Sequence, residues 1–249
     1  MTIHFIGVGP GSADLLTIRG QRFIKKSPIC LYAGSLVSKK ILDYCPKNVI
    51  KKNTAYMDLD KIFDEFKKAE KKKLDVSRLH SGDLSIWSAI GEQIRLLKKE
   101  KIPYTITPGV PSFAAAAAVI EKELTLPGIS QSVILTRTSG RASPVPKSEN
   151  IEHMAKTKAT LAIHLSIQNL KDLIDKISPF YGNDCPIIVL YKISHPDQRI
   201  YSGTLKNIVK LVPKSVTRTA LIIVGKVLGS SKFDNSSLYS KHYKRRYKK

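Results

Sequence analysis

The sequence predicts an α/β protein of two α/β domains, each a sheet flanked by helices, and three observations support this. The chain has 249 residues, whereas a typical domain has roughly 100–200 residues. Strand-like and helix-like segments alternate through the first half, and the pattern changes after about residue 115. We expect an N-terminal domain with a parallel sheet over 1–113, a C-terminal domain with a mixed sheet over 114–229, and a basic, disordered tail over 230–249.

Short segments that end near glycine predict the strands of the first half, and the first of them, Ile3–Val8, is largely apolar. The others are Pro28–Tyr32, Val76–His80 and Tyr104–Thr107. Helices are expected over Leu15–Lys26, with Ser12–Asp14 as its cap, and over Lys39–Tyr44, Asp58–Lys73 and Ala89–Lys99. This alternation predicts a parallel sheet, whose ligands bind at loops beyond the carboxyl ends of its strands.

The second half begins with five alanines at 114–118, which start a helix that another element can approach closely. A segment rich in glycine, proline and serine follows at 139–148. Further strands are expected at Val133–Thr136, Thr160–Leu165, Ile187–Tyr191, Arg199–Ser202 and Ala220–Val224, with helices at Ile167–Ile177 and Leu205–Leu211.

The chain is strongly basic, with a formal net charge of +22 and a pI of about 9.9. Such an excess indicates an anionic partner, which could be nucleic acid, a membrane surface or a polycarboxylate substrate. Six of the positive charges lie at the end of the tail, on Lys241, Lys244, Arg245, Arg246, Lys248 and Lys249, so most of the excess is spread over the rest of the chain. A lysine-rich proteome would give the same bias without functional meaning.

Composition also bears on location and redox chemistry. No apolar run approaches the ~18 residues that a membrane span needs, and the first residues lack the basic and apolar regions of a signal peptide, so we expect a cytoplasmic protein. The three cysteines, Cys30, Cys45 and Cys185, have the spacing of neither a zinc site nor a C-x-x-C pair. We expect them to be small core side chains.

Three loops follow the predicted parallel strands, at Gly7–Asp14, Ser81–Asp83 and Pro108–Phe113. The glycines of the first loop permit positive φ and close approach of a ligand to the backbone. Its spacing is not the G-x-G-x-x-G of a dinucleotide site, and Pro10 removes a donor where a pyrophosphate would lie. No acid follows Tyr32 to hold a ribose. An NAD enzyme is therefore disfavoured, and a simple tight turn remains an alternative.

The second loop places a carboxylate at a strand end, where Asp83 can either cap the next helix or hold a ligand. His80 beside it can either pack or bind. The sequence contains no nucleophile elbow, Walker loop, metalloprotease motif or paired-cysteine metal site, so we assign no catalytic residue, general base or metal. Such an enzyme works mainly by positioning its reactants, which suits methyl transfer from a sulfonium.

Taken together, these loops and later segments resemble the precorrin-4/cobalt-precorrin-4 C11-methyltransferases of cobalamin biosynthesis, a family of class III tetrapyrrole methyltransferases. The resemblance extends from Ile3 to about Gly229. Two segments, Phe5–Gly11 and Ser81–Asp83, are shared across the superfamily. The segments more specific to this branch are Tyr32–Val37, Arg78–Asp83, Pro108–Phe113, Thr125–Gln131, Ile134–Arg141 and Pro144–Pro146.

The resemblance implies the tetrapyrrole methylase fold, an active-site trough between two domains, a homodimer, and S-adenosyl-L-methionine as a methyl donor that leaves as S-adenosyl-L-homocysteine. Ala33 stands where uroporphyrinogen III methyltransferases carry aspartate, which argues against that reaction. Leu84 and Trp87 stand where the family usually has proline and tyrosine. Without that proline, the second loop is not expected to share the rigidity of the family's loop. By matching positions, the implied cofactor contacts are Pro10, Gly82, Asp83, Ile86, Ser112, Phe113, Leu165, Ala220 and Leu221.

The implied reaction is methylation of C11 of precorrin-4 or cobalt-precorrin-4 to give the corresponding precorrin-5. Precorrins carry many carboxylates, which guanidinium groups bind through paired hydrogen bonds. The candidates for binding them are Arg78, Arg137 and Arg141, with His80. Each arginine could equally form a surface or interdomain salt bridge. The sequence leaves open whether the natural substrate contains cobalt and what the basic tail does.

Three alternatives remain. Two lie in the same superfamily, namely another corrin-ring methyltransferase and a ribosomal RNA methyltransferase, and the third is a basic RNA-binding module without catalysis. Outside the tail, where Tyr243 and Tyr247 lie, the aromatic residues do not interleave with basic ones as stacking platforms do. A tetrapyrrole polycarboxylate is therefore favoured over nucleic acid or a membrane as the partner.

Overall fold

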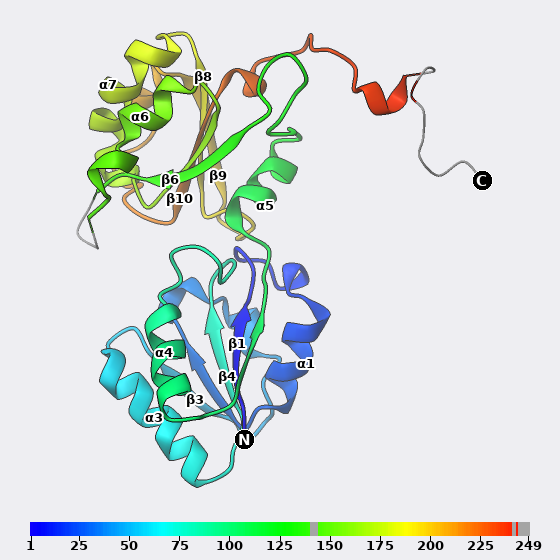
Figure 1. The fold of residues 1–249 in the computed structure, drawn as a ribbon, viewed down its shortest axis with the longest axis vertical. Coiled ribbons are helices and arrows are strands. Elements are labelled where there is room, and N and C mark those ends of the chain that lie inside the picture. Colours follow the sequence, from blue (N-terminus) through cyan, green and yellow to red (C-terminus); the bar gives the residue numbers. More distant parts are fainter. Residues whose placement is uncertain (140–143, 241–242, 244–249) are drawn as a thin grey trace. The chain divides into compact units, whose positions relative to one another are not determined.

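The computed structural model describes residues 1–139, 144–240 and 243, apart from the side chain of Ser35. The chain divides into two compact units, which we describe one at a time (Figure 1). The N-terminal unit comprises Met1–Ala115 with Ile193–Asp197, and the C-terminal unit comprises Ala116–Lys192 with Gln198–Lys249. Among the helices of the described ranges, none has both the length and the apolarity that a membrane crossing requires.

The N-terminal unit contains a five-stranded sheet in the order β3-β2-β4-β1-β5. Every neighbouring pair is parallel, as predicted. The strands are β1 (Ile3–Gly7), β2 (Ile29–Tyr32), β3 (Ile50–Asn53), β4 (Val76–His80) and β5 (Tyr104–Thr107). Because β1 lies between β4 and β5, the loops that follow these three strands all leave the same edge of the sheet.

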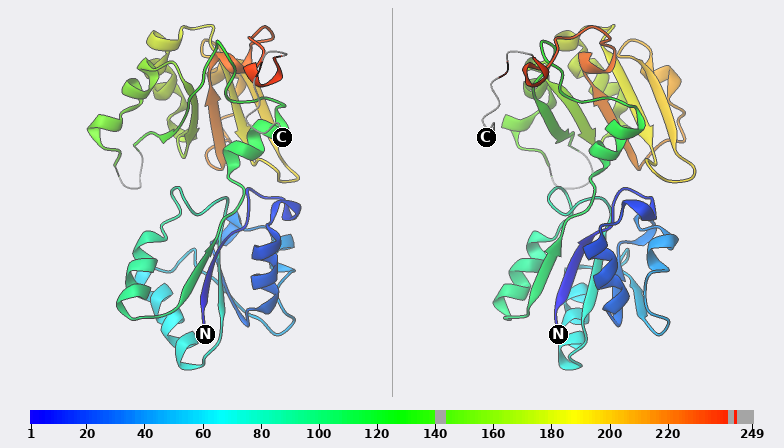
Figure 2. Two further views of the ribbon diagram at one scale, coloured as in Figure 1. Left: turned by 45° about the vertical axis from the view of Figure 1, so that its right-hand side comes forward. Right: turned by 90° about the vertical axis from the view of Figure 1, so that its right-hand side faces the viewer.

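Helices cover both faces of this sheet, with α1 on one side and α3 and α4 on the other (Figures 1 and 2). The helices are α1 (Ile18–Lys26), α2 (Lys39–Leu42), α3 (Leu59–Lys71) and α4 (Gly91–Lys99). Successive residues of β1 point to opposite faces, so Phe5 packs edge-on against Phe66 of α3 while Ile6 packs in the cluster of Ile24 of α1. Two separate cores therefore hold the sheet in place.

The structure of this unit differs from the prediction at two places. Ser12 does not cap the first helix, because Ala13–Leu15 forms a 3-10 turn and α1 begins at Ile18, where the Thr17 hydroxyl accepts a hydrogen bond from the Gly20 N–H. The glycine loop is thus separated from the α1 N-terminus. The strand β3 was missed because it lacks an apolar pattern. Its exposed lysine protects a sheet edge from further pairing.

The C-terminal unit contains a second five-stranded sheet in the order β6-β7-β10-β8-β9. Only β6 and β7 run parallel, and the other pairs are antiparallel, so the predicted mixed sheet is confirmed. Its strands are β6 (Val133–Arg137), β7 (Thr160–His164), β8 (Pro186–Tyr191), β9 (Arg199–Thr204) and β10 (Ala220–Val224).

The helices α6 and α7 lie side by side on one face of this second sheet (Figure 1). The core between them and the sheet contains Leu161, Ile163 and Leu173, all fully buried. The helices of this half are α5 (Ser112–Val119), α6 (Ile151–Lys156), α7 (Leu170–Tyr181) and α8 (Ile208–Leu211). The prediction missed α6, although Asn150 caps it by accepting from the His153 N–H at 2.8 Å.

The cysteines and the tail complete the fold. Cys30 and Cys185 are buried, Cys45 is half-buried, and all three are free thiols packed with apolar neighbours, as predicted. In the tail, Ser237–Tyr239 forms a 3-10 turn. Residues 241–242 and 244–249 lie outside the described part of the chain.

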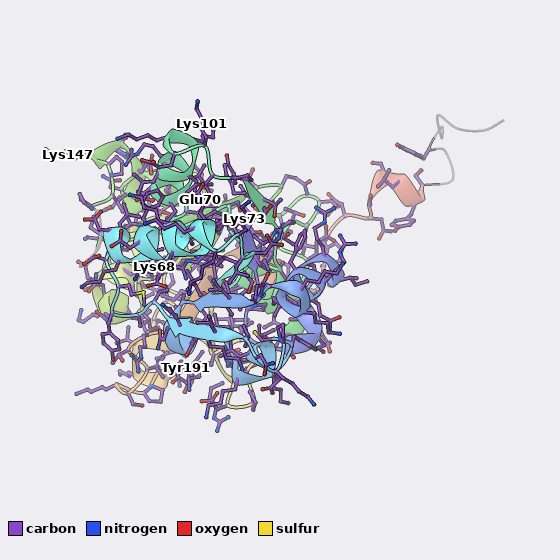
Figure 3. All side chains as sticks on the ribbon, turned by 90° about the horizontal axis from the view of Figure 1, so that it is seen from below. Lys68, Glu70, Lys73, Lys101, Lys147 and Tyr191 are labelled. Atoms are coloured by element: carbon purple, nitrogen blue, oxygen red, sulfur yellow. The ribbon has the colours of Figure 1, made fainter. Side chains whose placement is uncertain are left out.

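Within the described ranges, four helices are followed, two residues on, by a residue with positive φ that is not glycine. Lys73 after α3 has a φ of 54°, and Lys101 after α4 has a φ of 57°. Both residues are labelled in Figure 3. Glu121 and Lys158 follow α5 and α6 in the same conformation. Such turns favour glycine, because a side chain in the left-handed region costs roughly 1–2 kcal/mol.

We therefore expect Lys73→Gly and Lys101→Gly each to raise the free energy of unfolding by about 0.5–1 kcal/mol, since relief of strain exceeds the entropy that glycine adds to the unfolded chain. Thermal and urea unfolding would measure this. Lys72→Gly is the matched control, because Lys72 has a φ of −89°, and it should be neutral or destabilising. A lower melting temperature for Lys73→Gly than for the wild type would contradict the strain argument.

Candidate functional site

The three loops predicted to form the ligand site meet through their backbones. The Val8 N–H, next after β1, donates to the His80 carbonyl at 2.9 Å. Gly9 and Gly82 form a two-bond bridge, in which the Gly9 N–H donates at 3.1 Å and the Gly82 N–H donates back at 2.7 Å. The loops after β1 and β4 are therefore joined as one backbone unit.

Glycines allow the third loop to join this unit. A Cβ on Gly109 would lie 2.2 Å from the Gly82 carbonyl oxygen, and a Cβ on Gly7 would lie 2.6 Å from the Gly109 nitrogen. The space at Gly7, which the sequence suggested for a ligand, is thus filled by backbone. Gly82 differs, because it has a φ of +65° and a Cβ there would meet nothing within 4 Å. Of these three glycines, Gly82 borders open space.

The Asp83 carboxylate ties the second loop to the third. Its Oδ2 accepts from the Gly109 N–H at 3.0 Å, and its Oδ1 accepts from the Ser85 N–H at 2.8 Å and from the Ser85 hydroxyl. It does not cap α4, which begins at Gly91 after Ile90. Partial burial raises the pKa of Asp83, but these hydrogen bonds outweigh it and hold the pKa below its ordinary value.

The rest of the second loop, between Asp83 and α4, is bent and partly exposed. Trp87 and Ala89 have positive φ values of 48° and 51°. Leu84 is buried in the core beneath α3 and α4. The Trp87 side chain is 42% exposed, and that of Ile86 is half-buried. The loop thus has an apolar anchor at Leu84 and presents its tip to solvent.

Two of the predicted substrate-binding residues lie inside the N-terminal unit. Arg78 is 4% exposed, and its guanidinium donates to Gln93 Oε1 at 3.2 Å and to Thr54 Oγ1 at 3.0 Å. His80 is 6% exposed, and its Nε2 has no hydrogen-bond partner among the residues that the structure describes. Burial lowers the pKa of Arg78 to about 10, and burial together with the nearby Arg78 lowers the pKa of His80 to about 3. His80 is neutral at physiological pH.

One segment beside the first loop was not predicted. Ile193–Asp197 belongs to the N-terminal unit, and its Ser194 hydroxyl accepts from the Ser12 N–H at 3.0 Å. The His195 ring occupies the space where a Cβ on Gly11 would lie, 2.4 Å from its Cδ2. The sequence carries no signal for this contact, because it joins residues that lie more than 180 positions apart.

The remaining candidates of the N-terminal half are Pro10, Ser112 and Phe113, all half-buried. Ser112 is the first residue of α5. These positions lie on the first and third loops and leave part of each side chain accessible.

In the C-terminal unit, several candidates meet at one edge of the sheet. Arg137 ends β6 opposite His164 of β7, and Leu165 follows with a φ of 54° and a side chain that is 68% exposed. β10 runs antiparallel to β7, so its first residue, Ala220, lies at the same edge. Leu221 follows on β10 and is 4% exposed. Arg141 lies outside the described residues.

The family model of the tetrapyrrole (corrin/porphyrin) methylases matches residues 2–209. The precorrin-4 C(11)-methyltransferase of Sinorhizobium sp is 53% identical over 249 residues, covering 100% of this chain and 98% of that protein. The cobalt-precorrin-4 C(11)-methyltransferase of Methanocaldococcus jannaschii is 42% identical, covering 99% and 96%.

Solved structures give the same result. A cobalamin biosynthetic enzyme, cobalt precorrin-4 methyltransferase, has a TM-score of 0.88 at 35% identity, covering 91% of this chain and 95% of that one. A uroporphyrin-III C-methyltransferase from Thermus thermophilus has a TM-score of 0.77 at 21% identity, covering 92% and 99%. The second likeness concerns the fold alone. The predicted two-domain α/β fold is confirmed by both.

Proposed function

The chain belongs to the tetrapyrrole (corrin/porphyrin) methylases, and from this we propose that it transfers a methyl group from S-adenosylmethionine to C11 of precorrin-4 or cobalt-precorrin-4. The observation that carries the proposal is identity of 42–53% over essentially the full length to enzymes named for this reaction. The product would be the corresponding precorrin-5, formed in cobalamin biosynthesis, with S-adenosylhomocysteine as the by-product.

The chain's part in this reaction is to hold two reactants in line. S-adenosylmethionine supplies an activated methyl group and a thioether leaving group. The C11 carbon forms the new C–C bond as the S–CH₃ bond breaks, and one proton is released overall. Correct positioning can supply roughly 7–11 kcal/mol of the barrier reduction. The joined loops at Gly9, Gly82 and Gly109 suit that role, because their shared backbone contacts limit movement.

The proposed cofactor contacts include backbone as well as side chains. Gly82 borders open space, so a ligand can approach its backbone closely. Leu221 is buried, so it would contact the cofactor through its main chain. The full set is Pro10, Gly82, Asp83, Ile86, Ser112, Phe113, Leu165, Ala220 and Leu221.

Arg137 is proposed to bind a substrate carboxylate. Arg137→Ala should raise the KM for the tetrapyrrole by about tenfold, since a hydrogen bond to a charged group contributes about 1.5–3 kcal/mol. The affinity for S-adenosylhomocysteine should stay unchanged, as calorimetry would measure. Arg199→Ala is the matched control, because Arg199 lies on β9, the strand farthest from the β6 strand of Arg137 in the same sheet. Equal losses of substrate and cofactor binding would refute this role.

One assay tests the proposed reaction directly. The enzyme is incubated anaerobically with precorrin-4 or cobalt-precorrin-4 and S-adenosylmethionine, and NMR locates the new methyl group. Methylation at C11 supports the proposal, and methylation at another carbon would assign a different corrin-ring reaction. Salt-sensitive RNA binding without any affinity for S-adenosylhomocysteine would overturn it in favour of an RNA-binding role.

Three further assignments rest on the family. We propose that residues 1–113 and 114–229 are its two domains and that 230–249 is a tail outside the catalytic fold. We also propose a homodimer located in the cytoplasm. Light scattering would measure the oligomeric state, and loss of activity on removal of 230–249 would contradict the assignment of the tail.

A further inference from the structure

We infer that Arg78 and Gln93 are positioning residues that fix the bent tip of the second loop, Trp87–Ala89, for methyl-donor binding. The inference rests on the proposed function for its effect on binding. Its structural basis is a chain of hydrogen bonds within the N-terminal unit, from Arg78 on β4 through Gln93 on α4 to the Ala89 backbone.

Each hydrogen bond in this series has a fixed donor and a fixed acceptor. The Arg78 Nε donates to Gln93 Oε1 at 3.2 Å, and Gln93 Nε2 donates to the Ala89 carbonyl at 2.8 Å. Arginine has donors but no acceptor, so it can only be satisfied by the oxygen of the Gln93 amide. That requirement turns the amide nitrogen toward Ala89. The guanidinium thereby sets the orientation of the group that holds the loop.

Burial makes this arrangement costly to disturb. Arg78 and Gln93 are each 4% exposed, so neither can replace a lost partner with bulk water. The other hydrogen-bond partner of Arg78 is Thr54, whose hydroxyl also donates to the Tyr32 carbonyl. The bond to Thr54 uses Nη1 and the bond to Gln93 uses Nε, so Thr54 takes no part in the hydrogen bonds that lead to Ala89.

The loop tip needs such support because its backbone is strained. Trp87 and Ala89 both have left-handed φ values, which cost free energy in residues other than glycine. The Ser88 hydroxyl between them donates to the Leu84 carbonyl. The buried Gln93 of α4, oriented by Arg78 of β4, holds the bend at Ala89, in the same loop as the proposed cofactor contacts Asp83 and Ile86.

Gln93→Glu is the sharpest test. The carboxylate still accepts from Arg78, so the buried guanidinium retains a partner. Its second oxygen, however, replaces the NH2 group that donates to the Ala89 carbonyl. Trp87 is the only tryptophan of the chain, so its emission reports directly on the loop tip. We expect a red-shifted, more quenchable emission and an affinity for S-adenosylhomocysteine lower by about tenfold. Gln93→Leu should give the same changes.

Thr54→Val is the matched control. It removes one hydrogen bond of Arg78 but keeps the bonds from Arg78 to Gln93 and from Gln93 to Ala89. It should therefore lower the melting temperature and leave Trp87 emission and cofactor affinity at wild-type values. The inference is overturned if Gln93→Glu behaves as Thr54→Val does. If the wild type neither binds S-adenosylhomocysteine nor methylates a tetrapyrrole, the proposed function fails, whereas Trp87 emission still decides whether Gln93 positions the loop.

Discussion

Gly109→Ala is expected to separate the three joined loops and to lower the affinity for S-adenosylhomocysteine by about a hundredfold. An added Cβ would lie 2.2 Å from the Gly82 carbonyl oxygen and 2.6 Å from the Gly7 carbonyl carbon and oxygen. All of these are backbone atoms, so no side-chain rotation relieves the clash. Overpacking of this kind costs roughly 3 kcal/mol. If displacement of the three loops relieves all of this strain, the affinity for the ligand falls by about a hundredfold.

Calorimetry with S-adenosylhomocysteine and thermal unfolding together test this result. Gly91→Ala is the matched control, because a Cβ there would meet nothing within 4 Å and alanine favours a helix more than glycine does. Gly91 is the first residue of α4, so this variant should bind normally and unfold at the same or a higher temperature. A Gly109→Ala protein with wild-type affinity would show that the loops can separate without loss of the site.

The sheet of the N-terminal unit could be predicted because its pattern is local. Val76–His80 is a short segment that ends in Ser-Gly-Asp, and it forms β4 with the predicted bounds. The three loops could also be predicted, because parallel strands place their carboxyl ends at one edge. That rule needs only the order of strands and helices, which the sequence shows directly.

The contacts that define the site could not be predicted, because each joins distant residues. The sequence did not indicate that the Asp83 carboxylate accepts from Gly109, 26 positions away. Arg78 was expected to face a substrate carboxylate, whereas it lies buried beside Gln93. A charged side chain within a strand is usually exposed, and only the structure shows the neutral partners that allow its burial.

Asp83→Ala should weaken the affinity for S-adenosylhomocysteine by about tenfold or more, because it releases the third loop from the second. Hydrogen bonds to a charged acceptor contribute about 1.5–3 kcal/mol. The change also leaves the Gly109 N–H without its acceptor. Ser85→Ala removes only the hydroxyl that binds the same carboxylate, so it should have a smaller effect. Equal affinities for the wild type and Asp83→Ala would contradict the role of Asp83 as a link between loops.

The effect of Asp83→Ala should also depend on pH. The folded protein holds the pKa of Asp83 below its ordinary value of 3.8, so its carboxylate stabilises the fold above pH 4. That contribution is lost as the pH falls through the folded-state pKa, when the wild type becomes protonated. The difference in melting temperature between the wild type and Asp83→Ala should therefore be largest near pH 7 and shrink below pH 4. A difference that stays constant to pH 3 would mean that the charge of Asp83 does not hold the loops together.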